Sequence, residues 1–241
     1  MTDPARDVVP APPPTRIAVR GGGHFPVRRI YCVGRNFADH AREMGAQAPA
    51  SKADRGTPVF FAKPADAIVT SGDVPYPSAT QDLHHEVELV VALGADAPQG
   101  VLAVEDAQAL VFGYTVGLDL TRRDLQAVAK AKGLPWDVSK GFDASAPAGE
   151  LVPAAEVGAL AARTLSLEVN GERRQSSTLD ALIWDVPEIL HELSKLFALR
   201  AGDLVFMGTP AGVAALQAGD RCIARLDDVV ELHCRITSPS L

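Results

Sequence analysis

Short β-strand patterns that end at glycine and proline, with no regular alternation of strand and helix, limit most strongly how this chain can fold. Of its 241 residues, 20 are glycine and 18 are proline. A strict strand–helix alternation would predict a parallel sheet covered by helices. The irregular mixture predicts instead an α+β fold with a strand-dominated core, as one domain over residues 26–241. Strands are expected at 29–34, 58–64, 67–72, 84–94, 114–120 and 203–208, and within 221–236.

Four segments have the apolar spacing of helices, and several carry signals for their ends. Asn36 is expected to cap the first helix, and the spacing of Thr121 to Asp124 predicts a capping box-like start for the third. The dipeptide Asn170-Gly171 predicts the tight turn of a β-hairpin, because both residues tolerate positive φ. The helical segments are 37–44, 104–113, 121–133 and 185–199.

Charge and composition exclude several classes of protein. The net charge is −7 and the pI about 5.3, whereas a nucleic-acid-binding protein needs a basic face. The three cysteines lack metal-site or disulfide spacing, which is typical of a reducing cytoplasm. No apolar run has the length of a membrane span, so we expect no membrane partner. Residues 1–25 begin with a proline-rich stretch and are expected to form a flexible tail.

Acidic residues on one strand form the first candidate site. Side chains alternate along a strand, so Glu86 and Glu88 point to one face, about 6–7 Å apart at Cα. Asp119 follows another expected strand and could join them. Three carboxylates without cysteine favour a hard cation, Mg²⁺ or Mn²⁺. The alternative is a solvated strand face with Asp119 in an ordinary turn.

A histidine and a glutamate form the second candidate site. His40 and Glu43 are three residues apart and therefore share one face of the first helix. A carboxylate beside an imidazole orients it and raises its basicity, as a water-activating base requires. The alternative is an exposed polar helix face. The polar segment 46–56 after this helix is long for a connection, which is typical of a lid or a disordered loop.

Further polar side chains could bind or stabilise an anion. Lys140 and Gln126 could donate hydrogen bonds to a developing oxyanion, although such a lysine is ordinarily solvated. Lys63 ends an expected buried strand, where it needs either a partner or a path to water. The turn 208–212 contains Thr209, whose hydroxyl could hold an anion; a plain connecting turn is the alternative.

Together these segments resemble the fumarylacetoacetate hydrolase family. The similar stretches occur in order from Tyr31 to Ile236: YCVGRNFADHAREMG, FFAKP, DLHHEVELVVALG, GYTVGLDLTRRDLQ, KGLPWDVSKGFDASAP, VNGERRQ and VFMGTPAGV. The resemblance implies a strand-rich mixed β-roll, a homodimer, and Mg²⁺ or Mn²⁺ bound by an E-x-E pair and a later aspartate. The implied ligands are Glu86, Glu88 and Asp119.

The resemblance to the small acylpyruvase members of that family also assigns roles to other side chains. It implies that His40 and Glu43 activate water and that Lys140 and Gln126 stabilise the oxyanion. It places Lys63, Arg123 and Thr209 in the substrate pocket, where Arg35, Arg123 and Lys63 are candidates to bind a second carboxylate of the substrate. The separate N-terminal domain of the larger hydrolases is not found here, which makes fumarylacetoacetate a poor substrate candidate.

The expected reaction is cleavage of the C–C bond of an acylpyruvate, a small oxo-acid. The sequences of the motifs, especially HHEVELVVALG and GLDLTRRDLQ, are most similar to those of fumarylpyruvate hydrolases of the gentisate route, which release fumarate and pyruvate. The same fold could also decarboxylate oxaloacetate or isomerise an unsaturated oxo-diacid. A binding module without catalysis is a further alternative, which turnover measurements would distinguish from an enzyme.

Overall fold

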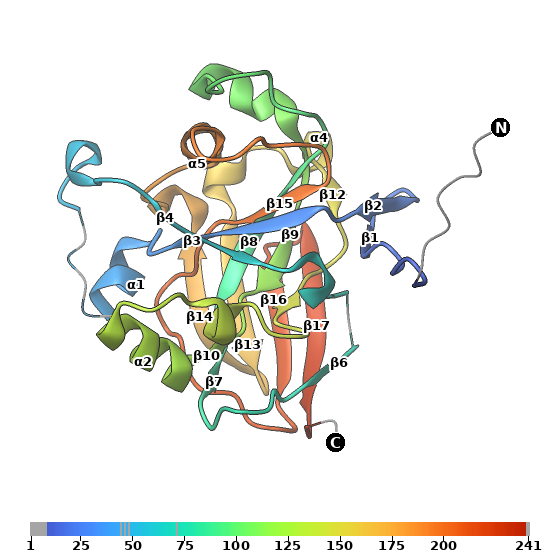
Figure 1. The fold of residues 1–241 in the computed structure, drawn as a ribbon, viewed down its shortest axis with the longest axis vertical. Coiled ribbons are helices and arrows are strands. Elements are labelled where there is room, and N and C mark those ends of the chain that lie inside the picture. Colours follow the sequence, from blue (N-terminus) through green and yellow to red (C-terminus); the bar gives the residue numbers. More distant parts are fainter. Residues whose placement is uncertain (1–8, 44, 46, 48, 71, 240–241) are drawn as a thin grey trace.

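Two mixed β-sheets form the body of the molecule (Figure 1). The computed structural model describes residues 9–239 except 44, 46, 48 and 71. Strand β15 pairs with β3 in parallel, whereas its pairing with β8 is antiparallel. The six-stranded sheet has the order β12 (Val152–Pro153), β9 (Val111–Leu118), β8 (Val87–Leu93), β15 (Asp203–Phe206), β3 (Arg29–Gly34) and β4 (Val59–Lys63).

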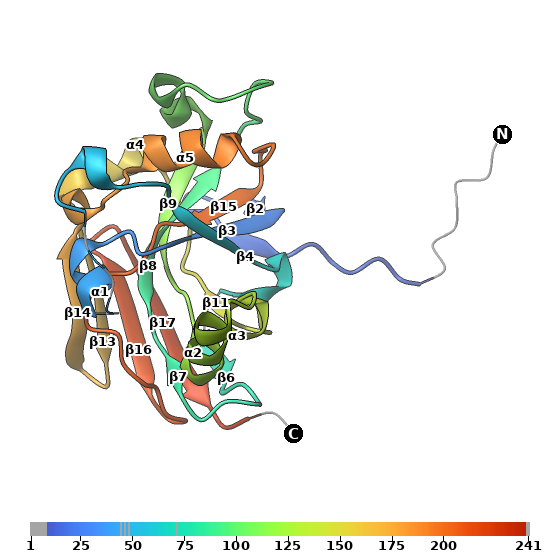
Figure 2. The ribbon, with the colours of Figure 1, turned by 60° about the vertical axis from the view of Figure 1, so that its left-hand side comes forward.

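The second sheet lies against the first and contains the predicted hairpin. Asn170 and Gly171 join two antiparallel strands with φ values of 54° and 83°, which confirms the turn. In Figure 2 this sheet stands to the left of β3 and β4. Its order is β14 (Glu172–Thr178), β13 (Thr164–Val169), β16 (Arg221–Leu226), β17 (Val230–Thr237) and β6 (Gly72–Pro75).

The six-stranded sheet is buried on both faces, which explains the valine-rich sequence of its central strand β8. Val87, Leu89 and Val91 pack into the core between the two sheets. Val90 and Ala92 point to a second core on the opposite face. A strand covered on both sides needs a nearly continuous apolar run. Glu88 interrupts that run. Because its side chain is only 2% exposed, its carboxylate needs a compensating partner inside the protein.

Helices are few and lie at the periphery, so the α+β, strand-dominated fold class is confirmed. Asp185 caps α5 by accepting a hydrogen bond from the Glu188 N–H at 2.9 Å, and Glu188 returns the bond as in a capping box. No helix in the described part of the chain has the length and apolarity to cross a membrane. The helices are α1 (Ala38–Glu43), α2 (Arg123–Lys132), α3 (Asp137–Lys140), α4 (Ala154–Val157) and α5 (Val186–Ser194).

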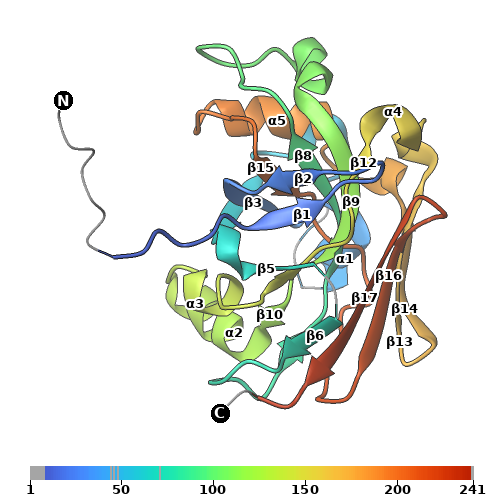
Figure 3. The same cartoon turned by 90° about the vertical axis from the view of Figure 1, so that its right-hand side faces the viewer.

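Part of the expected N-terminal tail is folded. Strands β1 (Arg16–Ala18) and β2 (His24–Pro26) form a hairpin (Figure 3). Its Ile17 is fully buried in the second core. The hairpin also bonds to the chain before β12, through Arg20 N–H to Leu151 O at 2.9 Å. The predicted boundary at residue 25 is therefore wrong for this part, and residues 1–8 lie outside the described residues.

Several predicted element boundaries differ from the structure. The strand expected over 84–94 is broken at His85 and Glu86, between β7 (Leu83–His84) and β8. The helix expected over 104–113 is a 3₁₀ helix that ends at Leu110, and Val111 already begins β9. In the segment expected as a strand over 67–72, the described residues form β5 (Ile68–Val69) and the first residue of β6, Gly72; residue 71 lies outside the described part. The helix expected over 185–199 ends at Ser194. Two further short strands are β10 (Thr121–Arg122) and β11 (Ala146–Pro147).

Two predicted helix caps are wrong, because tertiary contacts use the capping side chains elsewhere. Asn36 is fully buried and donates to Trp184 O and Met207 O, at 3.0 and 2.8 Å, instead of capping α1. Thr121 donates to Asp119 O at 3.0 Å, and α2 begins two residues later without a side-chain cap. Its end at Gly133, with a φ of 64°, agrees with the prediction.

Candidate active site

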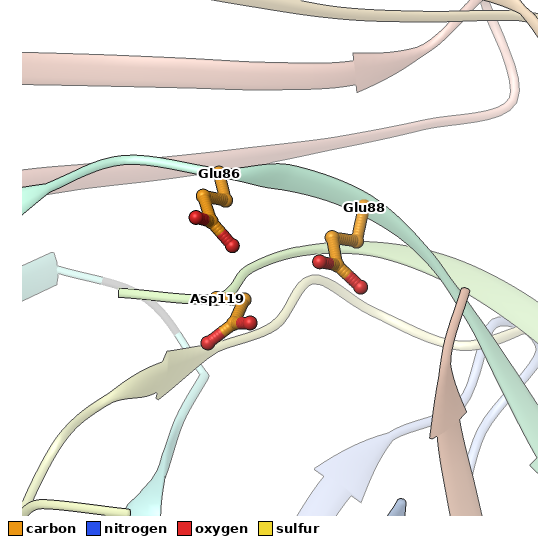
Figure 4. A group of neighbouring side chains, drawn as sticks. All are labelled: Glu86, Glu88 and Asp119. Carbon is orange, nitrogen blue, oxygen red and sulfur yellow. The ribbon is translucent and has the colours of Figure 1, made fainter. Parts of the chain in front are cut away.

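Three acidic side chains converge where β8 and β9 meet. Val87 pairs with Leu118, so Glu86 and Asp119 face each other just beyond the paired strands, joined by Asp119 N–H to Glu86 O at 2.8 Å. Glu88 lies two residues further along β8. One carboxylate oxygen from each of the three residues lies within 4.8 Å of the others (Figure 4). The structure therefore brings the predicted triad together in a buried position.

The charge balance of the triad makes it suited to a cation. Burial, followed by the neighbouring carboxylates Asp119 and Glu86, raises the pKa of Glu88 well above its usual value. Glu88 forms a hydrogen bond with Gly208 N–H at 2.7 Å, but no ion pair within the described residues. Oδ1 of Asp119 is buried without a well-aligned hydrogen bond. These all-oxygen ligands fit Mg²⁺ or Mn²⁺. A bound cation would neutralise the charge of Glu88 and would give Asp119 Oδ1 a partner.

Two lysines contact carboxylates of the triad. Lys140 donates to Glu86 Oε2 at 2.7 Å and to Asp119 Oδ2 at 2.5 Å. Burial opposes its charge, but Asp119 and Glu86 raise the pKa of Lys140 above its usual value. Lys63 lies 2.9 Å from Asp119 Oδ1 and also donates to the carbonyls of Leu120 and Lys140. The ammonium group of Lys63 is thus engaged by Asp119 and by the two carbonyls. Lys63 is not among the residues that line the pocket.

Helix α2 places an arginine and a glutamine beside the triad. The Arg123 guanidinium contacts Glu86 and donates to Gln126 Oε1 at 2.6 Å. Its Nε donates to His84 Nδ1 at 3.3 Å, and His84 in turn contacts Asp82 at 2.9 Å. Burial opposes the charge on Glu86, but Lys140 and Arg123 hold its pKa below the usual value. With its oxygen occupied by Arg123, Gln126 keeps its amide NH₂ available to the pocket that it lines.

The predicted histidine and glutamate contact each other on α1, beside the same pocket. His40 Nδ1 lies 3.1 Å from Glu43 Oε2, and the other carboxylate oxygen accepts from Gly212 N–H at 3.0 Å. Glu43 is therefore fixed by the turn 208–212. If it accepts the Nδ1 proton, Nε2 of His40 is the basic nitrogen. His40 lines the pocket together with Glu86, Glu88 and Asp119.

A buried glutamine that the sequence did not point to fixes Thr209. Gln175 on β14 is 1% exposed, in a strand whose neighbouring residues are mostly exposed. Its amide donates to Thr209 Oγ1 and to Pro210 O, both at 2.8 Å, and its oxygen accepts from Val87 N–H at 3.0 Å. Because Thr209 Oγ1 is an acceptor in this bond, its hydroxyl proton is left for a partner in the pocket. Gln175 thus links the turn 208–212 to strand β8.

The outer part of the pocket is lined by residues from β3, α2 and the segment before α3. Arg35 and Lys130 lie there with Trp136, and Lys130 was not a predicted site residue. Arg35 has a φ of 60°, a strained conformation for a residue with a side chain and one that is often found at functional sites. The pocket thus brings together every predicted site residue except Glu43, which contacts His40, and Lys63.

The segment after α1 is anchored away from the pocket. Arg55 stacks on Trp184 at 3.8 Å from the ring centroid and donates to both carboxylate oxygens of Glu188, at 2.8 and 3.0 Å. Hydrogen bonds from Arg55 and Lys52, together with the Asp185 N–H, outweigh burial and lower the pKa of Glu188 to about 2. This fixes one end of the expected lid 46–56, of which residues 46 and 48 lie outside the described part.

Known proteins are similar to this chain both in sequence and in structure. A fumarylpyruvate hydrolase from a Ralstonia species is 44% identical over 182 residues, which are 73% of this chain and 91% of that protein. An oxaloacetate tautomerase from Escherichia coli is 42% identical over 205 residues, 84% of this chain and 90% of that protein. The crystal structure of fumarylpyruvate hydrolase from Pseudomonas aeruginosa, in complex with Mn²⁺ and pyruvate, superposes with a TM-score of 0.90 at 44% identity, covering 97% of this chain and 100% of that one.

The family assignment follows from the extent of the match. The model of the fumarylacetoacetate hydrolase C-terminal domain matches residues 29–237, which include both sheets and every residue of the pocket. The predicted family is thereby confirmed. This chain belongs to the fumarylacetoacetate hydrolase family.

Proposed function

We propose that this chain is a metal-dependent hydrolase of acylpyruvates that converts fumarylpyruvate and water to fumarate and pyruvate. The observation that carries the proposal is that His40, paired with Glu43, lines the same pocket as the triad of Glu86, Glu88 and Asp119. A base and a cation-binding site in one pocket are what attack of water on a polarised carbonyl requires.

The triad would hold the cation, Mg²⁺ or Mn²⁺. When bound, such a cation stabilises the negative charge that develops on the oxygens of a 2,4-dioxo acid as the C3–C4 bond breaks. Support comes from the buried all-oxygen ligand set and from the Mn²⁺ in the related crystal structure. The homodimer, the cytoplasmic setting and the place in gentisate breakdown stay predictions.

His40 is the proposed base. Its Nε2 takes a proton from water, and the hydroxide formed attacks the C4 carbonyl. Glu43 holds the ring through Nδ1 at 3.1 Å and stabilises the imidazolium that results. The proton then passes to C3 of the departing pyruvate, which completes the addition of water across the C3–C4 bond.

Gln126 and Lys140 are proposed to stabilise the oxyanion at C4. The Gln126 amide faces the pocket because its oxygen is held by Arg123. Lys140 is bound to two carboxylates of the triad, so its ammonium would have to share its protons with the substrate oxygen. Thr209 offers a further hydroxyl donor.

Oxaloacetate tautomerisation is the second candidate, because a relative with that activity is 42% identical over 84% of the chain. Tautomerisation and decarboxylation need the cation but no attacking water. The His40–Glu43 pair favours hydrolysis, since it supplies a base suited to water.

Product analysis distinguishes the reactions. With Mn²⁺ and fumarylpyruvate we expect fumarate and pyruvate in equal amounts, and no products after metal removal with EDTA; consumption of substrate without fumarate would contradict hydrolysis.

A further inference from the structure

One face of helix α2 follows the pocket from the triad outward. Arg123, Gln126 and Lys130 are spaced by three and four residues, and all three line the pocket. Arg123 contacts the ligand Glu86, whereas Lys130 lies two helical turns further on, about 10 Å along the helix axis. The helix thus carries a cation at each end of the pocket.

The outer cations lack an acidic partner. In the part of the chain that the structure describes, Arg35 and Lys130 form no ion pair and no side-chain hydrogen bond. Lys130 Nζ lies 5.4 Å from the centroid of the Trp136 ring. Burial, and then repulsion by Arg123 and Arg35, lowers the pKa of Lys130. An anion bound between these side chains would remove that repulsion.

We propose that Lys130, with Arg35, binds a second carboxylate at the far end of the substrate's acyl group and so selects dicarboxylic acylpyruvates. This rests on the proposed function and names the substrate class of the same site. Two of the three predicted cations for this role are engaged elsewhere, because Lys63 is held by Asp119 and Arg123 by Glu86. Arg35 is the remaining predicted one, and Lys130 is new.

The geometry also separates long from short diacids. A substrate whose C1 carboxylate lies at the triad and whose acyl group extends along α2 brings its terminal carboxylate toward Lys130. Oxaloacetate carries its second carboxylate directly on C3, so its chain ends where the acyl group of an acylpyruvate begins and does not extend along α2 toward Lys130. The pair Arg35 and Lys130 therefore favours fumarylpyruvate over oxaloacetate.

The test uses two substrates that differ only at the end of the acyl group. Fumarylpyruvate ends in a carboxylate and crotonylpyruvate in a methyl group. For the Mn²⁺-loaded wild type we expect kcat/KM to be about 10- to 150-fold higher for fumarylpyruvate, the value of one or two charge-assisted hydrogen bonds. Lys130→Met should reduce this ratio to within about threefold of one, mainly through KM, because the pair is formed in ground and transition states alike. Arg35→Gln should lower it partially.

Lys132→Met is the matched control, since it removes the same charge from an exposed position on the same helix. It should retain the wild-type ratio. An equal loss with both substrates in Lys130→Met, or a wild-type ratio near one, would overturn the assignment of Lys130.

Binding keeps this proposal separable from the hydrolase proposal. In a His40→Ala background, whose hydrolysis should be slow, calorimetry gives Kd for both compounds in the presence of Mn²⁺. We expect the same 10- to 150-fold preference for fumarylpyruvate, abolished by adding Lys130→Met. A wild type that hydrolyses neither compound but retains this binding preference would contradict the hydrolase and support the subsite. Equal Kd values would overturn the subsite whatever the reaction.

Discussion

Glu88→Gln is expected to weaken Mn²⁺ binding by about 100-fold or more and to abolish turnover with it. Glu88 contributes one of three carboxylate oxygens and is 2% exposed. Its replacement removes an anionic ligand but keeps the side-chain volume. A glutamine oxygen can still accept the Gly208 N–H bond that Glu88 accepts at 2.7 Å. The measurement is calorimetric titration of the metal-free protein with Mn²⁺.

The fold should survive this substitution. Without metal, burial and the carboxylates Asp119 and Glu86 make the charged form of Glu88 unfavourable, so Glu88→Gln should leave Tm equal or higher in EDTA. Glu105→Gln, at an exposed position of a 3₁₀ helix, is the matched control and should keep wild-type Mn²⁺ affinity. Wild-type Mn²⁺ affinity in Glu88→Gln would refute the triad as the metal site.

His40→Ala is expected to lower kcat by about 10²- to 10⁴-fold, the usual loss for a positioned general base. His40 is 7% exposed in the pocket but is not one of the three ligands, so Mn²⁺ affinity should change little. Glu43→Gln should give a smaller loss, because the glutamine oxygen can still accept from Nδ1 but no longer stabilises the imidazolium. Steady-state kinetics with fumarylpyruvate at saturating Mn²⁺ measure these losses.

The control for this prediction is His24→Ala, which removes an exposed imidazole from β2 and should retain full kcat. A wild-type kcat in His40→Ala would show that α1 only covers the pocket. A parallel loss of Mn²⁺ affinity would show instead that His40 acts on the metal site.

The triad was predictable because it depends on short-range patterns. The alternation of Glu86 and Glu88 with valine requires only that β8 be extended, and Asp119 needed only to follow a strand. The pattern also allowed a solvated strand face with Asp119 in an ordinary turn. The β8–β9 pairing and the burial of all three carboxylates exclude that alternative. The strand actually breaks at Glu86, but the bond from Asp119 N–H to Glu86 O keeps the two residues opposed.

Gln175 shows what sequence patterns could not predict. It lies in a strand that is otherwise largely exposed, and the pairing register shifts beside it, between Leu167 and Glu168. Such a shift turns a side chain toward the core without any local sequence signal. The sequence did not predict Lys130 as a site residue for a related reason. Only the packing of α2 against the pocket distinguishes Lys130 from a solvated lysine such as Lys132.

The wrong helix caps have the same physical origin. The spacing of Thr121 and Asp124 suits a capping box, but Asp124 accepts bonds from Thr80 at 2.7 Å and from Gln81 N–H at 3.0 Å. Local propensity was outweighed by contacts between segments more than 40 residues apart.

The most direct test is a comparison of kcat/KM for fumarylpyruvate hydrolysis and for oxaloacetate tautomerisation, with one Mn²⁺-saturated preparation. Hydrolysis is followed by release of fumarate and pyruvate, and tautomerisation by loss of enol absorbance. We predict that fumarylpyruvate is preferred by about tenfold or more, because only hydrolysis uses both the His40–Glu43 base and the outer cations. A higher kcat/KM for oxaloacetate would contradict this account and assign the same pocket to keto–enol chemistry.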